Sequence, residues 1–228
     1  MMKAVIVLVH VALISMIIKN TRGVAPLFDF FKLAIQWPHG YCNDRNCART
    51  PEIFTIHDLW PTNTSGPPIE KCSTTSYTHL ADLKDIESLD ARWMDLSSSK
   101  SQVIEKQRFW SYEWEKHGTC SEKLYNQDQY FDLAVRLYEH FNITAILQNN
   151  KITRGNAHSL SSISAPIKAA TGFQPDIRCI KSRKHQQQSI LLEIGICWDF
   201  LGASPINSRQ GYSCGNVRAG HDPRVLFP

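Results

Sequence analysis

The N-terminal apolar segment constrains the fold of this chain more than any other feature, because it determines the redox conditions in which the chain folds. Residues 4–18 (AVIVLVHVALISMII) are almost entirely apolar and follow Lys3. Such a segment is typical of a secretory signal peptide, and it is shorter than the ~20 residues that a membrane span needs. We therefore expect a signal peptide at residues 1–25, cleaved near residues 23–25, and a secreted mature domain at residues 26–228 without stable membrane association.

All seven cysteines lie in the expected mature part. An exported chain meets an oxidising environment, where cysteines form disulfides more often than they bind metal. Their odd number leaves at least one unpaired, and the short polar loop between Cys42 and Cys47 predicts a local disulfide. Export also makes the sequons at Asn63 and Asn142 candidate glycosylation sites.

The charge of the mature chain is nearly balanced. The full sequence has 25 Lys+Arg against 21 Asp+Glu, but the signal peptide contains three of the basic residues and none of the acidic ones. The mature net charge is then +1, so any attraction to phosphate must come from local clusters. The 43% hydrophobic content excludes a disordered or collagen-like chain.

Hydrophobic patterning predicts one α+β domain, with a central antiparallel sheet packed by several helices and stapled by disulfides. No repeat, long linker or change of composition divides the mature chain. Apolar residues at helical spacing predict helices, and apolar runs or alternation predict strands. The expected strands are Phe28–Trp37, Ile53–His57 and Ser189–Phe200, with a turn at residues 38–40, and the expected helices are Val103–His117, Gln127–Phe141 and Ser159–Thr171.

Two segments differ from ordinary core or loop sequence. The segment FTIHDLWP, residues 54–61, places a histidine on the polar face of a short strand. In FWSYEWEKHGTC, residues 109–120, Glu113 and His117 are spaced i,i+4 on a helix and Lys116 lies three residues after the glutamate. A carboxylate, an ammonium group and an imidazole thus gather at the C-terminal end of one helix.

These groups have the composition that metal-independent cleavage of RNA requires. A base removes the 2′-hydroxyl proton, an acid protonates the departing 5′ oxygen, and a cation stabilises the crowded phosphorane. His57 and His117 can perform the two proton transfers and Lys116 can supply the cation. The ordinary alternatives are a solvated helix face and a structural histidine. Because the chain has no CxxC or HExxH pair, we expect no metal and no cofactor.

The two segments resemble the active-site motifs of the ribonuclease T2 family, commonly HGLWP and FWxHEWxKHGTC. The opening FDFFKLAIQWPHGYC also resembles the mature N-terminus of that family, and the resemblance extends over residues 27–214, including EIGICWDF. The chain is therefore identified as a member. Membership implies a monomeric endoribonuclease that cleaves single-stranded RNA through a 2′,3′-cyclic phosphate to a 3′-phosphate.

The resemblance also implies roles for individual residues. His57 would be the general acid and His117 the general base, while Glu113 and Lys116 would stabilise the phosphorane-like transition state. The remaining tryptophans, Trp37, Trp110 and Trp114, are expected in the core. The residues that match substrate-binding positions are Trp60, near one base, and Gln36 and Phe109, at the second base site.

Two positions depart from the motifs. Asp58 replaces a glycine, and its carboxylate could pair with His57 and raise its pKa, repel the incoming phosphate, or point into solvent without effect. Tyr112 replaces a third histidine, and its hydroxyl can still donate a hydrogen bond to phosphate, so reduced activity is expected.

The missing third histidine and an alkaline isoelectric point resemble the S-ribonucleases of plant self-incompatibility. That resemblance implies a role in the style and recognition by pollen F-box proteins, for which the polar stretch from Thr62 to Lys84 is the candidate surface. One alternative is a defence or phosphate-scavenging ribonuclease, and another is a catalytically silent storage or binding glycoprotein.

The family resemblance implies three disulfides, Cys42–Cys47, Cys72–Cys120 and Cys179–Cys214. A fourth family bridge would join Cys197 to a partner before Cys214, where this chain offers only serines. Cys197 is therefore expected to be a free, half-buried and inert thiol.

Overall fold

The computed structural model describes residues 27–184, 187–208, 212–214 and 222–228. The expected signal peptide, residues 1–25, lies outside the described residues. Among the residues that are described, no helix has the length and apolar character needed to cross a bilayer.

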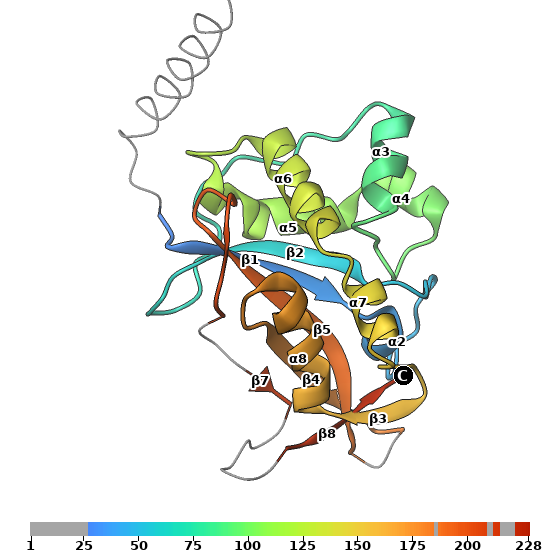
Figure 1. Cartoon of the computed structure of the whole chain (residues 1–228). Coiled ribbons are helices and arrows are strands. Elements are labelled where there is room, and N and C mark those ends of the chain that lie inside the picture. Colours follow the sequence, from blue (N-terminus) through green and yellow to red (C-terminus); the bar gives the residue numbers. More distant parts are fainter. Residues whose placement is uncertain (1–26, 185–186, 209–211, 215–221) are drawn as a thin grey trace, which may run out of the picture.

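The described residues form one mixed sheet with helices on both sides, which confirms the predicted α+β architecture (Figure 1). The main strand order is β2-β1-β5-β4-β7, with β6 and β8 also paired to β5 and β3 paired to β8. All pairs are antiparallel except β4–β7 and β5–β8. The strands are β1 (Phe30–Gln36), β2 (Thr55–Thr62), β3 (Asn156–Ser159), β4 (Asp176–Lys181), β5 (Ser189–Asp199), β6 (Pro205–Ile206), β7 (Tyr212–Ser213) and β8 (Arg224–Phe227).

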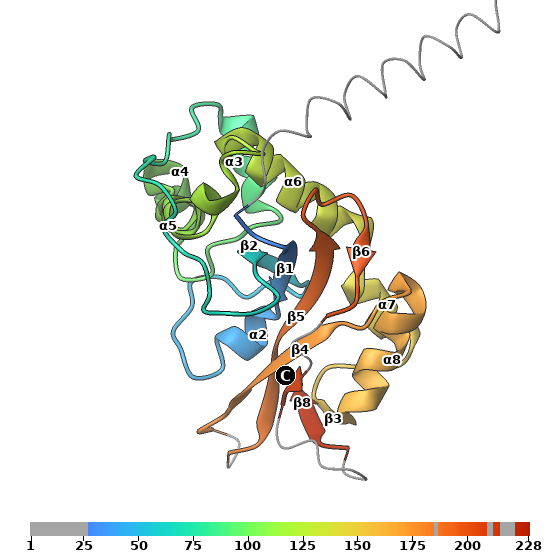
Figure 2. The same ribbon diagram turned by 90° about the vertical axis from the view of Figure 1, so that its left-hand side faces the viewer.

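The helices divide into two groups around the sheet. Helices α3 to α6 gather near β2, whereas α7 and α8 lie on the side of β5 opposite α2 (Figures 1 and 2). The helices are α2 (Pro38–Tyr41), α3 (Leu83–Asp90), α4 (Lys100–Lys106), α5 (Arg108–Lys116), α6 (Gln127–His140), α7 (Ile143–Asn149) and α8 (Leu160–Thr171), and a 3₁₀ turn spans Gly118–Ser121.

The core lies between the apolar face of the sheet and these helices. The apolar stripe of α6 is buried as its spacing predicts, and Asn126 caps the helix with a side chain that accepts from the Gln129 amide. Strand β5 is buried along nearly its whole length on both faces, as expected of a central strand. The three tryptophans expected in the core, Trp37, Trp110 and Trp114, are each 1% exposed.

Two local predictions outside the second strand were wrong. The expected turn at residues 38–40 is the short helix α2, and the single helix expected over Val103–His117 is broken at Gln107 into α4 and α5. Gln107 adopts a left-handed conformation with φ 45°. Its buried amide accepts from the Tyr77 hydroxyl and exchanges two hydrogen bonds with the backbone of Leu80, which fixes the break.

The structure contains three disulfides, which join the pairs implied by the family resemblance: Cys42–Cys47, Cys72–Cys120 and Cys179–Cys214. Cys197 is a free cysteine, but it is buried rather than half-buried, with 2% of its surface exposed. Burial raises the pKa of its thiol to about 11, so the reactive thiolate is scarce at neutral pH.

Candidate active site

A β-bulge places the first histidine. The register pairs Ile35 with Ile56 and Ala34 with Asp58, so His57 is the extra residue on β2. The bulge shifts the alternation of faces by one residue, so that Leu59 and Pro61 are buried while Trp60 and Thr62 are partly exposed. The strand predicted to end at His57 therefore continues to Thr62.

The imidazole of His57 is held by a buried carboxylate that the sequence analysis did not identify. Its Nδ1 hydrogen-bonds to Oε1 of Glu193 on β5, and the other oxygen of that carboxylate accepts from Arg178 Nη1 at 2.6 Å. Burial alone would lower the pKa of His57, but the hydrogen bond and charge of Glu193 outweigh it and raise that pKa. His57 is thus poised to carry a proton.

Replacing Glu193 with glutamine should preserve the hydrogen bond to His57 but remove the charge that holds its proton. We expect the alkaline limb of the kcat/KM profile to move to lower pH, with activity on that limb falling about tenfold, the order of effect of a neighbouring charge. RNA cleavage measured across the pH range tests this. The matched control is Glu52→Gln, which removes a carboxylate from the distant His39 and should leave the profile unchanged.

The second histidine lies at the end of α5. His117 is the residue that follows the last helical position, Lys116, and it directly precedes the 3₁₀ turn that starts at Gly118. The next residue is glycine because a Cβ on Gly118 would lie 2.4 Å from the Trp114 ring. Close packing of the helix end, rather than a left-handed cap, therefore orients His117.

Glu113 lies between the two histidines. Its Oε1 is 3.8 Å from His57 Nε2, and its Oε2 is 3.9 Å from His117 Nε2. Burial raises the pKa of this carboxyl, against the opposing effect of His57. The imidazoles of His57 and His117, which are far apart in the sequence, thus lie on either side of one buried carboxyl.

The pKa values of the two histidines are shifted in opposite directions. Burial, together with the charge of Lys116, lowers the pKa of His117 to about 4, whereas the pKa of His57 is raised. At neutral pH His117 is therefore a free base, while His57 holds its proton to higher pH than an ordinary histidine does. A pair of titratable groups whose pKa values are shifted in opposite directions is typical of a site that performs acid–base catalysis.

Asp58 neither pairs with His57 nor points into solvent. Its side chain is fully buried, and Oδ1 accepts from the Tyr130 hydroxyl at 2.8 Å and from the Leu59 amide at 2.7 Å. Its Oδ2 is 3.6 Å from His117 Nε2. Two of the three possibilities raised from the sequence are therefore wrong, because the bulge turns Asp58 toward α5 and α6 instead of toward His57.

Lys116 lies at the mouth of the site. Its Nζ is 3.4 Å from Glu70 Oε1 and 5.4 Å from the centre of the Tyr112 ring. Burial would lower the pKa of Lys116, but Tyr112 and Glu70 outweigh this effect and raise that pKa. The side chain of Lys116 is therefore positively charged at neutral pH. The Tyr112 side chain is exposed, where its hydroxyl is accessible to a ligand.

These residues line two cavities. A cavity of about 440 Å³ is lined by Trp60, Lys116 and His117 together with the loop of residues 61–70. A second cavity, of about 250 Å³, is lined by His57, by Gln36 and Phe109, which match the second base site, and by Tyr112, which replaces the third histidine. The Phe109 ring stacks on His57 at 6.4 Å, with 14° between the ring planes.

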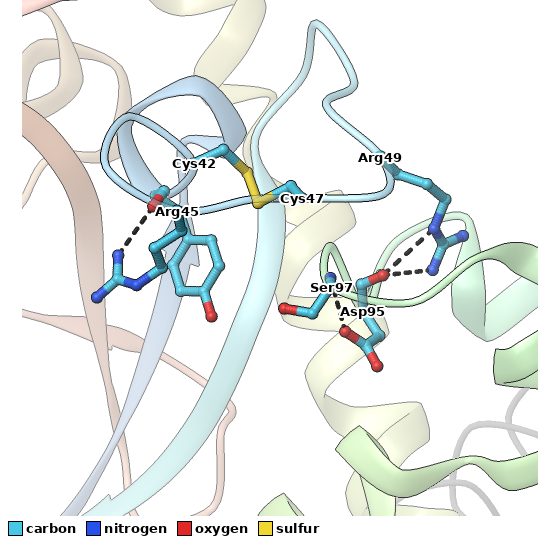
Figure 3. The surroundings of a disulfide bond; sticks show 7 residues. Cys42, Arg45, Cys47, Arg49, Asp95 and Ser97 are labelled. Carbon is cyan, nitrogen blue, oxygen red and sulfur yellow. Dashed lines mark hydrogen bonds between the residues drawn. A yellow bond between two sulfur atoms is a disulfide. The ribbon is translucent and has the colours of Figure 1, made fainter.

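The segment that follows the Cys42–Cys47 disulfide contacts residues that line the second cavity (Figure 3). Arg49, just beyond the disulfide, donates to the Asp95 carbonyl at 2.7 Å and forms an ion pair with Asp90. Asp95 and Ser97 line that cavity, and the Ser97 amide donates to the Asp95 carboxylate. Arg49 therefore ties the segment that follows the disulfide to one side of the site.

One group among the described residues has the composition of a metal site: Asp58, Glu113 and His117, whose ligand atoms lie within 4.8 Å of one another. The two sequons lie on the surface. Asn63 borders the larger cavity, and the exposed Asn142 caps α7 with an oxygen that accepts from the Ala145 amide.

Comparisons with known proteins place the chain in a family. Residues 28–209 match the Ribonuclease T2 family. Ribonuclease S-2 of Nicotiana alata is 36% identical over 202 residues, covering 88% of this chain and 89% of that protein. Ribonuclease 3 of Arabidopsis thaliana is 33% identical over 216 residues, covering 91% and 92% of the two chains. The crystal structure of the Nicotiana alata self-incompatibility-associated SF11-RNase has 32% identity and a TM-score of 0.78, covering 88% of this chain and 98% of that one.

The fold and these matches define an endoribonuclease. The chain belongs to the Ribonuclease T2 family.

Proposed function

We propose that the protein cleaves single-stranded RNA by acid–base transphosphorylation at His57 and His117. The observation that carries this proposal is the convergence of two histidines with opposite pKa shifts on Glu113, between two cavities. Neutral His117 takes the proton of a 2′-hydroxyl as its oxygen attacks phosphorus. Protonated His57 gives its proton to the 5′ oxygen as the phosphorus–oxygen bond breaks, which leaves a 2′,3′-cyclic phosphate.

The second step reverses the two roles. His57, now neutral, takes a proton from water as the water oxygen attacks the cyclic phosphate, and His117 returns its proton to the 2′ oxygen. The product is a 3′-phosphate, and both histidines regain their starting states. In each step Lys116 lies where a cation would stabilise the extra charge on the phosphorane, and Glu113 keeps both imidazoles in place.

The pKa directions predict a bell-shaped dependence of kcat/KM on pH. Activity should rise with pH as His117 loses its proton near its pKa of about 4, and fall above the ordinary histidine value of 6.5 as His57 loses its own. Initial rates on a ribodinucleotide over a broad pH range test this. A rate that climbs without an alkaline fall would exclude protonated His57 as the acid.

The two cavities favour a substrate whose neighbouring bases point away from each other. Trp60 in the larger cavity and Phe109 in the smaller one offer aromatic faces, and stacking of a base on such a face contributes ~1–3 kcal/mol. Bases are free to splay in this way in single-stranded RNA. Gln36 and Tyr112 supply polar groups in the smaller cavity, so we assign that cavity to the second base.

We propose further that the protein is secreted as a monomer after loss of residues 1–25, is glycosylated at Asn63 and Asn142, and acts in self-incompatibility. Several of the relatives carry the S-ribonuclease name, which supports that role. Pollen F-box proteins would then recognise the polar stretch from Thr62 to Lys84, which is largely exposed. Expression confined to the style supports this biology, and induction in roots or wounded leaves contradicts it.

A defence or phosphate-scavenging ribonuclease is the second candidate. The observation that favours it is the similar identity, 33%, to Ribonuclease 3 of Arabidopsis thaliana, whose name does not refer to self-incompatibility. Both candidates use the same chemistry, so the tissue of expression separates them. A catalytically silent glycoprotein is disfavoured by family membership, and a gel containing RNA tests it directly.

A further inference from the structure

Asp58 is a buried carboxyl with one oxygen that no donor reaches. Oδ1 is satisfied by Tyr130 and Leu59, but Oδ2 has no hydrogen-bond partner among the described residues. A buried polar atom left without a partner costs ~1–3 kcal/mol, and an ionised carboxylate costs more. The environment of Oδ2 therefore needs an explanation.

Two titratable groups face Oδ2, from the end of α5. His117 Nε2 is 3.6 Å away, too far for a hydrogen bond, and a carboxyl oxygen of Glu113 lies within 4.8 Å of a carboxyl oxygen of Asp58. On α6 only the Tyr130 hydroxyl faces Asp58, and it is already used by Oδ1. The ammonium group of Lys116, at the end of α5, is paired with Glu70.

Two buried carboxyls this close together are stabilised when they hold one proton between them. If both were ionised, two negative charges would repel each other in a buried site beside a neutral His117. One shared proton removes the repulsion and gives Oδ2 its missing partner. Burial and the neighbouring carboxyl act in the same direction, and they raise the pKa of Asp58 well above its ordinary value.

We propose that Asp58 is a positioning residue that shares one proton with Glu113, so that the pair presents a single negative charge between the two histidines. The proposal rests on the proposed function for its catalytic meaning. It also answers whether Asp58 repels the incoming phosphate, which is the third possibility raised from the sequence. A protonated Asp58 adds no negative charge, so it does not repel phosphate at neutral pH. Loss of the shared proton at alkaline pH would place a second negative charge beneath the phosphate.

The pH dependence of stability tests the shared proton without RNA. The native pair holds a proton that the unfolded chain releases above the ordinary pKa of aspartate, so the wild type should lose stability with rising pH relative to Asp58→Asn, whose amide mimics the protonated acid. We expect the ratio of the two unfolding constants to change about tenfold between about pH 5 and pH 6. Urea unfolding with intact disulfides measures it. A ratio that does not change with pH would overturn the proposal.

Two further variants keep that test interpretable. Asp132→Asn removes an exposed carboxyl on α6 and should show no such change in the ratio. If Asp58→Asn does not fold, Asp58→Gly takes the family's common residue and should lose the same pH dependence. An infrared band of a protonated carboxylic acid should be present in the wild type at neutral pH and absent from both Asp58 variants, and its absence from the wild type would contradict the shared proton.

The pH profile of cleavage tests the positioning role. Above both pKa values the logarithm of kcat/KM should fall with a slope approaching two in the wild type, since His57 and the carboxyl pair each lose a proton, and with a slope of one in Asp58→Asn. Equal slopes would exclude the catalytic role of the shared proton. Failure of the acid–base reaction itself would appear separately, as undiminished cleavage by His57 and His117 variants.

Discussion

Replacing His117 with alanine should lower kcat/KM about 10²–10⁴-fold in protein that remains folded and disulfide-bonded, because no other group is placed to take the 2′-hydroxyl proton. Glu113, the nearest alternative base, lies 3.9 Å from the imidazole and is itself buried. Cleavage of a ribodinucleotide measures the loss. The matched control is His79→Ala, which removes an exposed histidine and should keep the wild-type rate.

The leaving group of the substrate separates the roles of the two histidines. His57→Ala should be about as damaging as His117→Ala on RNA, but its activity should recover on a ribonucleotide 3′-nitrophenyl ester, whose leaving group departs without protonation. His117→Ala should not recover on that ester, because the 2′-hydroxyl still needs a base. Recovery of the His117 variant alone would show that the acid and base assignments are reversed.

Removing the Cys72–Cys120 disulfide should lower the free energy of unfolding by about 4 kcal/mol. The bridge closes a loop with a sequence separation of 48, and the chain-entropy model gives a loss of that size. Serine at both positions removes the bridge with little change in volume. The control is the pair Cys42–Cys47, whose separation of five predicts a loss of only about 2 kcal/mol in the same model.

The same variant should also weaken substrate binding. The bridge holds the loop that contributes Glu70 to the larger cavity, and the neighbouring Lys71 amide donates to the Lys116 carbonyl at 2.7 Å. We expect KM to rise more than kcat falls, since the histidines are also held by the sheet and α5. Urea unfolding and steady-state kinetics measure the two effects. A similar loss of stability in the two disulfide variants would contradict the loop-length argument.

The helices and strands that could be predicted from the sequence are those in which apolar residues follow one regular pattern from end to end. The stripe of α6 and the apolar run of β5 specify helix and strand locally, and both are confirmed. The break at Gln107 could not be predicted, because its cause is a set of hydrogen bonds to Tyr77 and Leu80, about thirty residues earlier in the chain.

The motifs identified the catalytic candidates, but the contacts that tune them depend on the sheet. The position of Asp58 follows from a one-residue bulge, which strand alternation does not reveal. Glu193 did leave a signal: it is the one charged residue in the otherwise apolar run ILLEIGICW, residues 190–198. A charge in a central strand needs a buried partner, and that requirement could have connected Glu193 with His57.

The most direct test of the central claim is the phosphorus NMR spectrum of a ribodinucleotide during cleavage, recorded in the presence of a chelator. Acid–base catalysis by His57 and His117 predicts a 2′,3′-cyclic phosphate that forms first and is converted to a 3′-phosphate, with no cleavage of the matching 2′-deoxy substrate. Cleavage of the 2′-deoxy substrate, or direct release of a 5′-phosphate, would contradict it.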